Sequence, residues 1–224
     1  MLPNHSGTLV DEESKTQWRV PEWFAHLSDL QLEQLRVFHV ELISFNGRIN
    51  LISPRSERNA DIMHFADCIS AGEALLASTA EQEIYDIGSG NGLPGIILAI
   101  LDPARKIVMI DKDARKIEFL KHVAGKLNLK NALPVHSRIE DLPETSVKCA
   151  ISRGFASIGK ALVACRKVAA PGMEYYHMKS ESWVTEAADI PPQICSYWQP
   201  QLVKKYTLPA NLASMHLILT KRTE

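Results

Sequence analysis

The sequence predicts a doubly wound α/β fold, in which parallel strands alternate with helices that cover both faces of one sheet. Short β-prone runs alternate with helical patterns between residues 84 and 169. A glycine-rich segment directly follows the first of these runs. With 224 residues, of which 46% are hydrophobic and 23% charged, the chain has the profile of an ordinary globular protein with one principal domain.

The first predicted helix begins near residue 28, after a lead-in over residues 1–20 that shows no sustained period and is expected to be frayed. Ser28 and Gln31 form a capping-box pattern, because the Ser side chain can accept from the third helical amide while Gln31 reaches back. Apolar residues then recur every three to four positions, which predicts a helix of about four turns. These residues are Leu32, Leu35, Phe38, Leu42 and Phe45.

A second helix is predicted over residues 56–77. Its inward face is expected to hold Ile62, Phe65, Ile69, Leu75 and Leu76. Together the two helices predict an N-terminal extension, so we divide the chain into a lead-in and helical extension over residues 1–78 and a core over residues 79–224. We expect the whole chain to form one compact unit.

The core is predicted from the alternation itself. Strands are expected at residues 84–87, 107–110 and 147–151, and helices at residues 95–101, 114–127 and 158–169. This order implies parallel βαβ units. Further strands are expected at residues 173–179, 201–207 and 214–221, the last two joined as a hairpin through a loop at residues 209–211.

Composition excludes several classes of function. The formal net charge of -1 gives no global argument for a polyanionic partner, so any nucleic-acid contact must come from a local patch. Cys68, Cys149, Cys165 and Cys195 are scattered without zinc spacing, which predicts reduced structural thiols and no metal site. Neither a membrane-spanning stretch nor a signal peptide is evident, so we expect a cytoplasmic protein with no membrane partner.

The strongest functional signal is the segment 83–95, a β-prone run that ends in a turn with glycines at 88, 90, 92 and 95. A backbone without Cβ atoms can approach a nucleotide closely and adopt positive φ. Pro94 suits the first turn of the following helix. The loop is therefore expected to hold a ligand at the carboxyl end of the first strand.

Two ligand classes fit this loop. Residues 90–95 match the dinucleotide pattern G-x-G-x-x-G, which favours a nicotinamide cofactor. Asp86, two residues before the first glycine, favours the cationic ligand S-adenosylmethionine by Coulomb attraction, because a pyrophosphate avoids carboxylates. Ser89 and Gly90 belong to the same candidate cofactor site.

Asp111 ends the second β-prone run about 20 residues after the glycines, where an acid can accept from ribose hydroxyls in either cofactor class. The neighbouring Lys112 is included as a further cofactor contact. The alternative is that the glycines form only a tight turn and Asp111 caps the helix at residues 114–127.

At these residues the chain resembles a known family, the bacterial 16S rRNA guanine-N7 methyltransferases, also called glucose-inhibited division protein B. The resemblance runs from about residue 38 to the C-terminus. It is carried by Phe45-Asn46 with Asn50 to Ser53, His64 with Asp67, Asp86 to Gly95, Asp111 with Arg115-Lys116 and Phe119-Leu120, Ser137 to Glu140, Ile151 to Ser157, and Lys179.

The resemblance implies a Rossmann-like methyltransferase fold with a mostly parallel seven-stranded sheet, S-adenosylmethionine as cofactor, and N7 of guanine 527 in 16S rRNA as acceptor. Carried over by position, cofactor contacts fall on Gly88, Leu93, Ile139, Glu140 and Arg153. The partner is then 16S rRNA or the small ribosomal subunit, and we expect a monomer.

Three departures from the family pattern stand out. Phe45 and Cys68 replace the usual Trp and Ser, and Ala114-Arg115-Lys116 replaces Gly-Lys-Arg. The inverted basic pair exchanges a planar guanidinium for a point charge at each position. This affects the expected RNA contacts more than the cofactor site.

The chemistry assigned by the resemblance needs no general base, because guanine N7 carries a lone pair and no proton. Rate should come from alignment and from exclusion of water. Arg153 is our candidate for orienting cofactor or guanine, since arginine is shaped to donate to the O6 edge of guanine. A surface ion pair is the alternative role for Arg153.

Contacts to RNA phosphates are expected from five basic residues, although a solvated helix face is the alternative for each. They are Arg115, Lys116, Lys121, Arg138 and Lys179. His64 is a further RNA-contact candidate, with a hydrogen-bonded packing role as its alternative.

Three other functions remain open on the sequence. The chain could methylate a small molecule or a protein, because the fold does not determine the acceptor. It could be a nicotinamide-dependent oxidoreductase, or a binding module that keeps the cofactor pocket. Thermal-shift titration with S-adenosylhomocysteine against NAD separates the cofactor classes.

Overall fold

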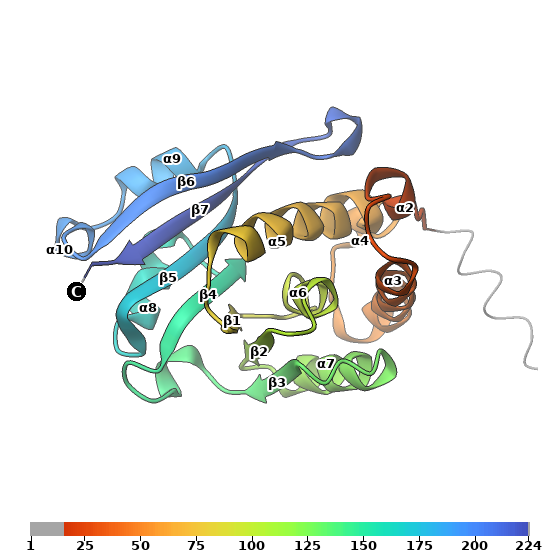
Figure 1. Cartoon of the computed structure of the whole chain (residues 1–224), viewed down its shortest axis with the longest axis horizontal. Helices are drawn as coiled ribbons and strands as arrows, with labels where there is room; N and C mark the ends of the chain where they lie inside the picture. Colours follow the sequence, from red (N-terminus) through yellow and green to blue (C-terminus); the bar gives the residue numbers. More distant parts are fainter. Residues whose placement is uncertain (1–15, 224) are drawn as a thin grey trace, which may run out of the picture.

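The computed structural model describes residues 16–223, and Figure 1 shows how their elements are arranged. In chain order they are α2 (Val20–Trp23), α3 (Asp29–Ile49), α4 (Pro54–Glu57), the π-helix η1 (Asp61–Ala66), α5 (Asp67–Ser78), β1 (Glu83–Ile87), α6 (Gly95–Leu101), β2 (Lys106–Asp111), α7 (Ala114–Lys126), β3 (Ala132–His136), η2 (Ile139–Asp141), β4 (Val147–Arg153), α8 (Ile158–Cys165), β5 (Ala169–Ser180), α9 (Trp183–Ala188), α10 (Pro192–Cys195), β6 (Trp198–Thr207), η3 (Pro209–Asn211) and β7 (Ser214–Arg222).

One seven-stranded sheet organises the described residues, in the order β3-β2-β1-β4-β5-β7-β6. The pairs from β3 to β5 are parallel, while β7 runs antiparallel to both of its neighbours. The predicted doubly wound α/β class is confirmed. The strand order reverses between β1 and β4, and in such sheets a ligand crevice forms outside the carboxyl ends of the strands at that point.

Strand β3 was not predicted from the sequence. Its five residues include Pro134 and do not form a continuous apolar run. Proline is tolerated here because β3 is an edge strand, so one side of its backbone needs no ladder partner.

Helices cover both faces of the sheet, and each face has its own hydrophobic cluster (Figure 1). One cluster unites α3 and α5 of the extension with α6 and α7, through buried residues such as Phe38, Ile69, Leu98 and Leu120. The other cluster lies beneath α8, and Leu162 and Tyr175 are among its members. The extension is thus part of the packing of one face.

The first predicted helix is confirmed as α3, with the predicted capping box at Ser28 and Gln31. At 21 residues it is longer than the four turns that the apolar stripe indicated. Its end is set by Asn50, which takes a left-handed conformation, and by the Asn46 side chain, which accepts from the amides of Leu51 and Ile52 at 2.8 Å each.

The second predicted helix is not one continuous α-helix. Residues 54–78 form α4, a turn at residues 58–59, the π-helix η1 and then α5. The break coincides with a contact to the lead-in, because the Arg19 guanidinium pairs with the buried carboxylate of Asp61 at 2.9 Å. The prediction of a frayed lead-in is therefore wrong for residues 16–20, because α2 starts at Val20, which is fully buried. Residues 1–15 of the lead-in lie outside the described part.

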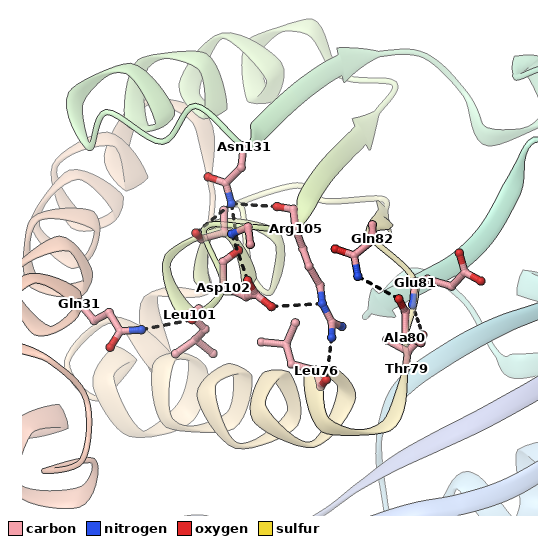
Figure 2. Close-up of polar contacts among 12 residues, drawn as sticks. Gln31, Leu76, Thr79, Ala80, Glu81, Gln82, Leu101, Asp102, Arg105 and Asn131 are labelled. Carbon is pink, nitrogen blue, oxygen red and sulfur yellow. Dashed lines mark hydrogen bonds and ion pairs between the residues drawn. The ribbon is translucent and has the colours of Figure 1, made fainter.

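The carboxyl end of α6 is held by side chains from three other parts of the chain (Figure 2). The Gln31 amide of α3 donates to the carbonyls of Ile100 and Leu101 at 3.4 and 3.2 Å. Asn131 donates to the carbonyls of residues 99, 102 and 105, and Arg105 donates to the carbonyl of Leu76 at 3.0 Å. The bonds from Gln31 and Asn131 satisfy the last carbonyls of α6, and the Arg105 bond ties the segment after α6 to α5, so the helix that carries the glycine loop is fixed at its other end.

The C-terminal part differs from prediction mainly in its boundaries. Helix α8 ends at Cys165 rather than at residue 169, because Ala169 already begins the long strand β5. The predicted hairpin is confirmed as β6 and β7, joined by the short helix η3. The short helices α9 and α10 were not predicted.

Two findings concern the cysteines and the possibility of a membrane-spanning helix. All four cysteines are free, with Cys195 exposed and the other three buried. Within residues 16–223, every helix is too short or too polar to cross a bilayer.

Candidate functional site

Two cavities lie side by side along the carboxyl edge of the sheet. The glycine-loop cavity, of about 410 Å³, is lined by Ile87, Gly88, Ile110, Asp111, Lys112, Lys116, Ser137, Arg138, Ile139, Glu140, Gly154 and Phe155. The hairpin cavity, of about 670 Å³, is lined by Met63, Asp67, Arg153, Gly154, Met178, Lys179, Ser180, Leu208, Leu212, Ala213 and Met215. Gly154, just after β4, belongs to both.

The glycine loop is bound tightly to the end of β2. The amides of Gly88 and Ser89 donate to the Ile110 carbonyl at 2.9 and 3.0 Å. The Gly90 amide donates to Oδ2 of Asp111 at 2.8 Å. Gly88, Gly90 and Gly92 have positive φ, as expected for this turn.

Two of the four glycines serve packing, which the sequence pattern did not distinguish from ligand approach. A Cβ at Gly92 would lie 2.8 Å from side-chain atoms of both Ile96 and Leu120. A Cβ at Gly95 would lie 2.7 Å from the Asp86 carboxylate and from Met109. Of the four, only Gly88 lines the cavity.

Asp86 contacts the loop and does not line the cavity, so the Coulomb attraction expected of it stays a prediction. Its carboxylate is buried and accepts from the Gly95 amide at 2.9 Å, and its carbonyl accepts from the Ser89 hydroxyl at 2.8 Å. Burial raises the pKa of Asp86 to about 7. The first amide of α6 donates its hydrogen bond to this carboxylate. A pyrophosphate, which would need that amide, therefore cannot bind it.

Asp111 lines the cavity with a carboxylate that is held at both oxygens. Besides the Gly90 contact, Oδ1 accepts from the Asp113 amide at 2.8 Å. The cap of α7 is Asp113, whose side chain accepts from the Arg115 amide, so the alternative of Asp111 as the helix cap is wrong. A carboxylate oxygen has further lone pairs, so Asp111 can still accept from a ligand.

The remaining cofactor candidates divide between the cavity and the core. Lys112, Ile139 and Glu140 line the cavity. Ser89 and Leu93 are buried in the loop outside the cavity lining, and Leu93 joins the hydrophobic cluster beneath it. Ile87, Ile110 and Phe155 add apolar lining and were not predicted as cofactor contacts. Ile87 and Phe155 belong to segments that carry the family resemblance, and Ile110 precedes Asp111.

Arg153 lies in the hairpin cavity, not in the glycine-loop cavity. Its Nε donates to Oδ2 of Asp67 at 3.0 Å, and its Nη2 donates to the Met63 carbonyl at 3.2 Å. Because Asp67 is only 1% exposed, the alternative of a surface ion pair is wrong. Burial raises the pKa of Asp67, while the Arg153 charge and a hydrogen bond from Tyr206 act in the opposite direction.

His64 bridges the π-helix to Arg153. Its Nδ1 lies 2.6 Å from Nη2 of Arg153, and its Nε2 lies 2.9 Å from the Ser56 hydroxyl. Burial and the Arg153 charge lower the pKa of His64 to about 3, so the ring is neutral at physiological pH. We assign Nδ1 as the acceptor, because a guanidinium can only donate.

The five basic RNA-contact candidates are distributed unequally. Lys116 and Arg138 line the glycine-loop cavity, and Lys179 lines the hairpin cavity. Arg115 and Lys121 lie outside both cavities and pair with Asp113 and Glu118. Lys179 is also engaged, since it donates to Glu186 at 2.7 Å and to the Ala156 carbonyl at 2.8 Å. Over residues 16–223, no group of three or more His, Cys, Asp or Glu side chains could hold a metal ion.

Comparison of the sequence with known proteins gives one consistent family. The family model GidB, described as rRNA small subunit methyltransferase G, matches residues 31–208. Ribosomal RNA small subunit methyltransferase G 3 of Bdellovibrio bacteriovorus is 43% identical over 92% of this chain and 93% of its own length. Ribosomal RNA small subunit methyltransferase G of Escherichia fergusonii is 32% identical over 87% of this chain and 91% of its own.

Solved structures share the fold at low sequence identity. A SAM-dependent methyltransferase from Aquifex aeolicus superposes with a TM-score of 0.53 at 15% identity, over 75% of this chain and 98% of its own. The tRNA (m1A58) methyltransferase TrmI of the same organism gives a TM-score of 0.54 at 15% identity, over 71% of this chain and 69% of its own. The Rossmann-like methyltransferase architecture is thus shared.

Proposed function

The chain belongs to the GidB family of rRNA small subunit methyltransferases G, and from that premise we propose that it methylates N7 of guanine 527 in 16S rRNA. It is an S-adenosylmethionine-dependent enzyme that acts on small-subunit rRNA. Methylation of another acceptor, oxidoreduction with a nicotinamide and a purely binding role are not favoured. The observation that carries the proposal is the pair of cavities that meet at Gly154.

The glycine-loop cavity fits the methyl donor. Its volume of about 410 Å³ lies within the range of about 300–1,000 Å³ typical for small-ligand sites. Asp111, Ile110 and Ile139 line this cavity, which supports a role for the Asp111 carboxylate as acceptor of ribose hydroxyls and for the two isoleucines as apolar surface against an adenine ring. When bound, S-adenosylmethionine supplies an electrophilic methyl group on its sulfonium. We keep Asp86, Ser89, Gly90 and Leu93 as residues that shape the loop from behind.

The hairpin cavity is our proposed acceptor site. Arg153 lines it with a side chain that is 20% exposed and can donate to O6 of a guanine, which leaves N7 free. No proton leaves N7, so the residues around it need only align the base and exclude water. Lys116 and Arg138, at the neighbouring cavity, would contact RNA phosphates.

Binding of the cofactor tests the donor site. We expect isothermal calorimetry to detect binding of S-adenosylhomocysteine and none of NAD, because Asp86 occupies the amide that a pyrophosphate would use. Asp111→Ala should lower the affinity for S-adenosylhomocysteine by about tenfold or more, because it removes both an acceptor for the ribose and the carboxylate that binds the Gly90 amide. Binding of NAD in place of S-adenosylhomocysteine would contradict the proposal.

Methylation in the cell tests the acceptor. In a strain that lacks this protein, mass spectrometry of 16S rRNA should show the loss of one 7-methylguanosine, and the wild-type gene should restore it. Arg153→Ala should restore little or none, while the purified variant still binds S-adenosylhomocysteine. Full restoration with Arg153→Ala would refute its role in orientation.

Three finer points belong to the same proposal. We infer that the protein acts in the cytoplasm, as a monomer, on 16S rRNA or on the small ribosomal subunit. The family and the rRNA named for its relatives support the location and the substrate. The monomer rests on the sequence analysis alone. Methylation assays with naked rRNA and with purified subunits would separate the two substrates.

A further inference from the structure

A chain of hydrogen-bonded polar side chains links the C-terminal hairpin to the acceptor cavity. The Tyr206 hydroxyl of β6 donates to Oδ1 of Asp67 at 2.7 Å, and Oδ2 of the same carboxylate accepts from Nε of Arg153 at 3.0 Å. Tyr206 lies 139 residues from Asp67 in the sequence, and Asp67 lies 86 residues from Arg153. The three residues come from an edge strand, a helix and a central strand, so only the folded sheet brings them together.

These contacts restrict the guanidinium of Arg153 on two of its three nitrogens. Nε is bound by Asp67, and Nη2 is bound by the Met63 carbonyl and His64. Among residues 16–223, Nη1 has no hydrogen-bond partner, and it is not one of the buried unpartnered atoms. Since the side chain lines the hairpin cavity, Nη1 is the donor left for a bound molecule.

We propose that Tyr206 is a positioning residue for methyl transfer, which acts through Asp67 to aim Arg153 at the acceptor base. This inference rests on the proposed function. Because the Asp67 carboxylate is bound at both oxygens, it cannot rotate, and the Arg153 guanidinium that it binds keeps one orientation. Without the Tyr206 hydroxyl, Oδ1 of the buried carboxylate loses its only side-chain donor among the described residues, and Asp67 can turn away. Small displacements of this kind slow reactions that depend on alignment.

Tyr206→Phe tests the link, because it removes one oxygen and keeps the ring. Tyr85→Phe is the matched control, since the Tyr85 hydroxyl also donates to a carboxylate, that of Glu83 at 2.7 Å, outside both cavities. We expect Tyr206→Phe to lower kcat on 16S rRNA by about 10- to 100-fold, with KM for RNA and the Kd of S-adenosylhomocysteine changed by less than about threefold. Tyr85→Phe should leave all three constants unchanged.

A second experiment separates positioning from a general structural role. In an Arg153→Lys background, which lacks the fork that Asp67 orients, adding Tyr206→Phe should lower kcat by less than about twofold further. If Tyr206→Phe lowers kcat as much in the Arg153→Lys background as it does in the wild-type protein, Tyr206 does not act through Arg153. Should Tyr206→Phe melt below the assay temperature, Asp67→Asn probes the same link and is expected to show the same loss of kcat with intact S-adenosylhomocysteine binding.

The outcomes distinguish this inference from the function on which it rests. If the wild-type protein methylates 16S rRNA and Tyr206→Phe keeps at least half of its kcat, the positioning role is overturned and the proposed function stands. If kcat and S-adenosylhomocysteine affinity fall together, Tyr206 is structural and the role is likewise overturned. If the wild-type protein binds S-adenosylhomocysteine but methylates no rRNA, both proposals fall.

Discussion

At the scale of single residues, Asp86 shows how a buried carboxylate can brace a loop from outside the lining of the cavity. Its side chain bonds the first amide of α6 and its carbonyl accepts from Ser89, so both ends of the residue brace the loop. The energetic cost is a buried acid whose pKa is raised to about 7. Protonation of this group therefore couples loop stability to pH in the physiological range.

Asp86→Asn should change how stability depends on pH. Between about pH 4 and pH 7 the folded wild-type protein keeps a proton on Asp86 that the unfolded chain has lost, so its stability falls as pH rises through this window. Asparagine cannot titrate, so the variant should gain stability relative to wild type over the same window, by up to roughly 1.4 kcal/mol per unit of pKa shift. Urea unfolding at pH 5, 6, 7 and 8 measures the difference.

Asp113→Asn is the control for this titration. Arg115 lowers the pKa of the exposed Asp113, which has therefore lost its proton in both states well below pH 5. The stability difference between Asp113→Asn and wild type should be constant from pH 5 to pH 8. A constant difference for Asp86→Asn as well would show that Asp86 is ionised throughout this range.

At the scale of elements, α6 depends on side chains from outside itself. It is only seven residues long, and isolated helices of that length are unstable in water. Asp86 binds its first amide, while Gln31 and Asn131 bind its last carbonyls. Helix α3 therefore supports the cofactor loop through α6 without approaching the loop cavity, whose lining includes none of its residues.

Gln31→Glu should separate this support from the capping box of α3. Glutamate still accepts from the Ser28 amide but cannot donate to the α6 carbonyls, and its charge is repelled by that end of the helix. We expect a loss of about 1–3 kcal/mol in the free energy of unfolding, measured with urea. Gln201→Glu, the same change at an exposed position, should stay within about 0.5 kcal/mol of wild type.

At the scale of the whole molecule, we propose that the extension and the core, divided between residues 78 and 79, fold as one unit over the described residues 16–223. The buried cluster on one face of the sheet contains Phe38 and Leu42 from α3 together with Ile97 and Leu120 from the core. Residues that share one close-packed cluster are expected to unfold together.

Tryptophan fluorescence can test this cooperativity. With Trp18 and Trp23 replaced by Phe, the remaining reporters are Trp183 and Trp198, both far from the extension in the sequence. In that background, Leu42→Ala in α3 should lower the free energy of unfolding by about 2–5 kcal/mol. The Tm reported by the two remaining tryptophans should fall by several degrees. Leu212→Ala, at a side chain that is 52% exposed, should shift it little. An unchanged Tm with Leu42→Ala would mean that the two parts unfold separately.

Much of this architecture could be predicted, because periodicity and turn chemistry are local. The capping box at Ser28, the loop at residues 83–95 and the alternation after it all depend on neighbours within a few residues. Strand β3 and the interruption at the π-helix escaped prediction, since β3 is a short edge strand that contains a proline and the interruption lies where Asp61 pairs with the distant Arg19. The start of β5 was also predicted wrongly, because contacts between residues that are distant in the sequence decide it.

By itself, the sequence determined the doubly wound fold, the loop and the residue types available for the chemistry. Only the tertiary structure decided which of those residues share a cavity. It assigned Asp111 and Ile139 to one cavity and Arg153 to the next, and it joined Tyr206 to Arg153 through Asp67. The physical reason is that secondary structure arises from contacts between near neighbours in the chain, whereas a site arises where sheet order brings distant strand ends together.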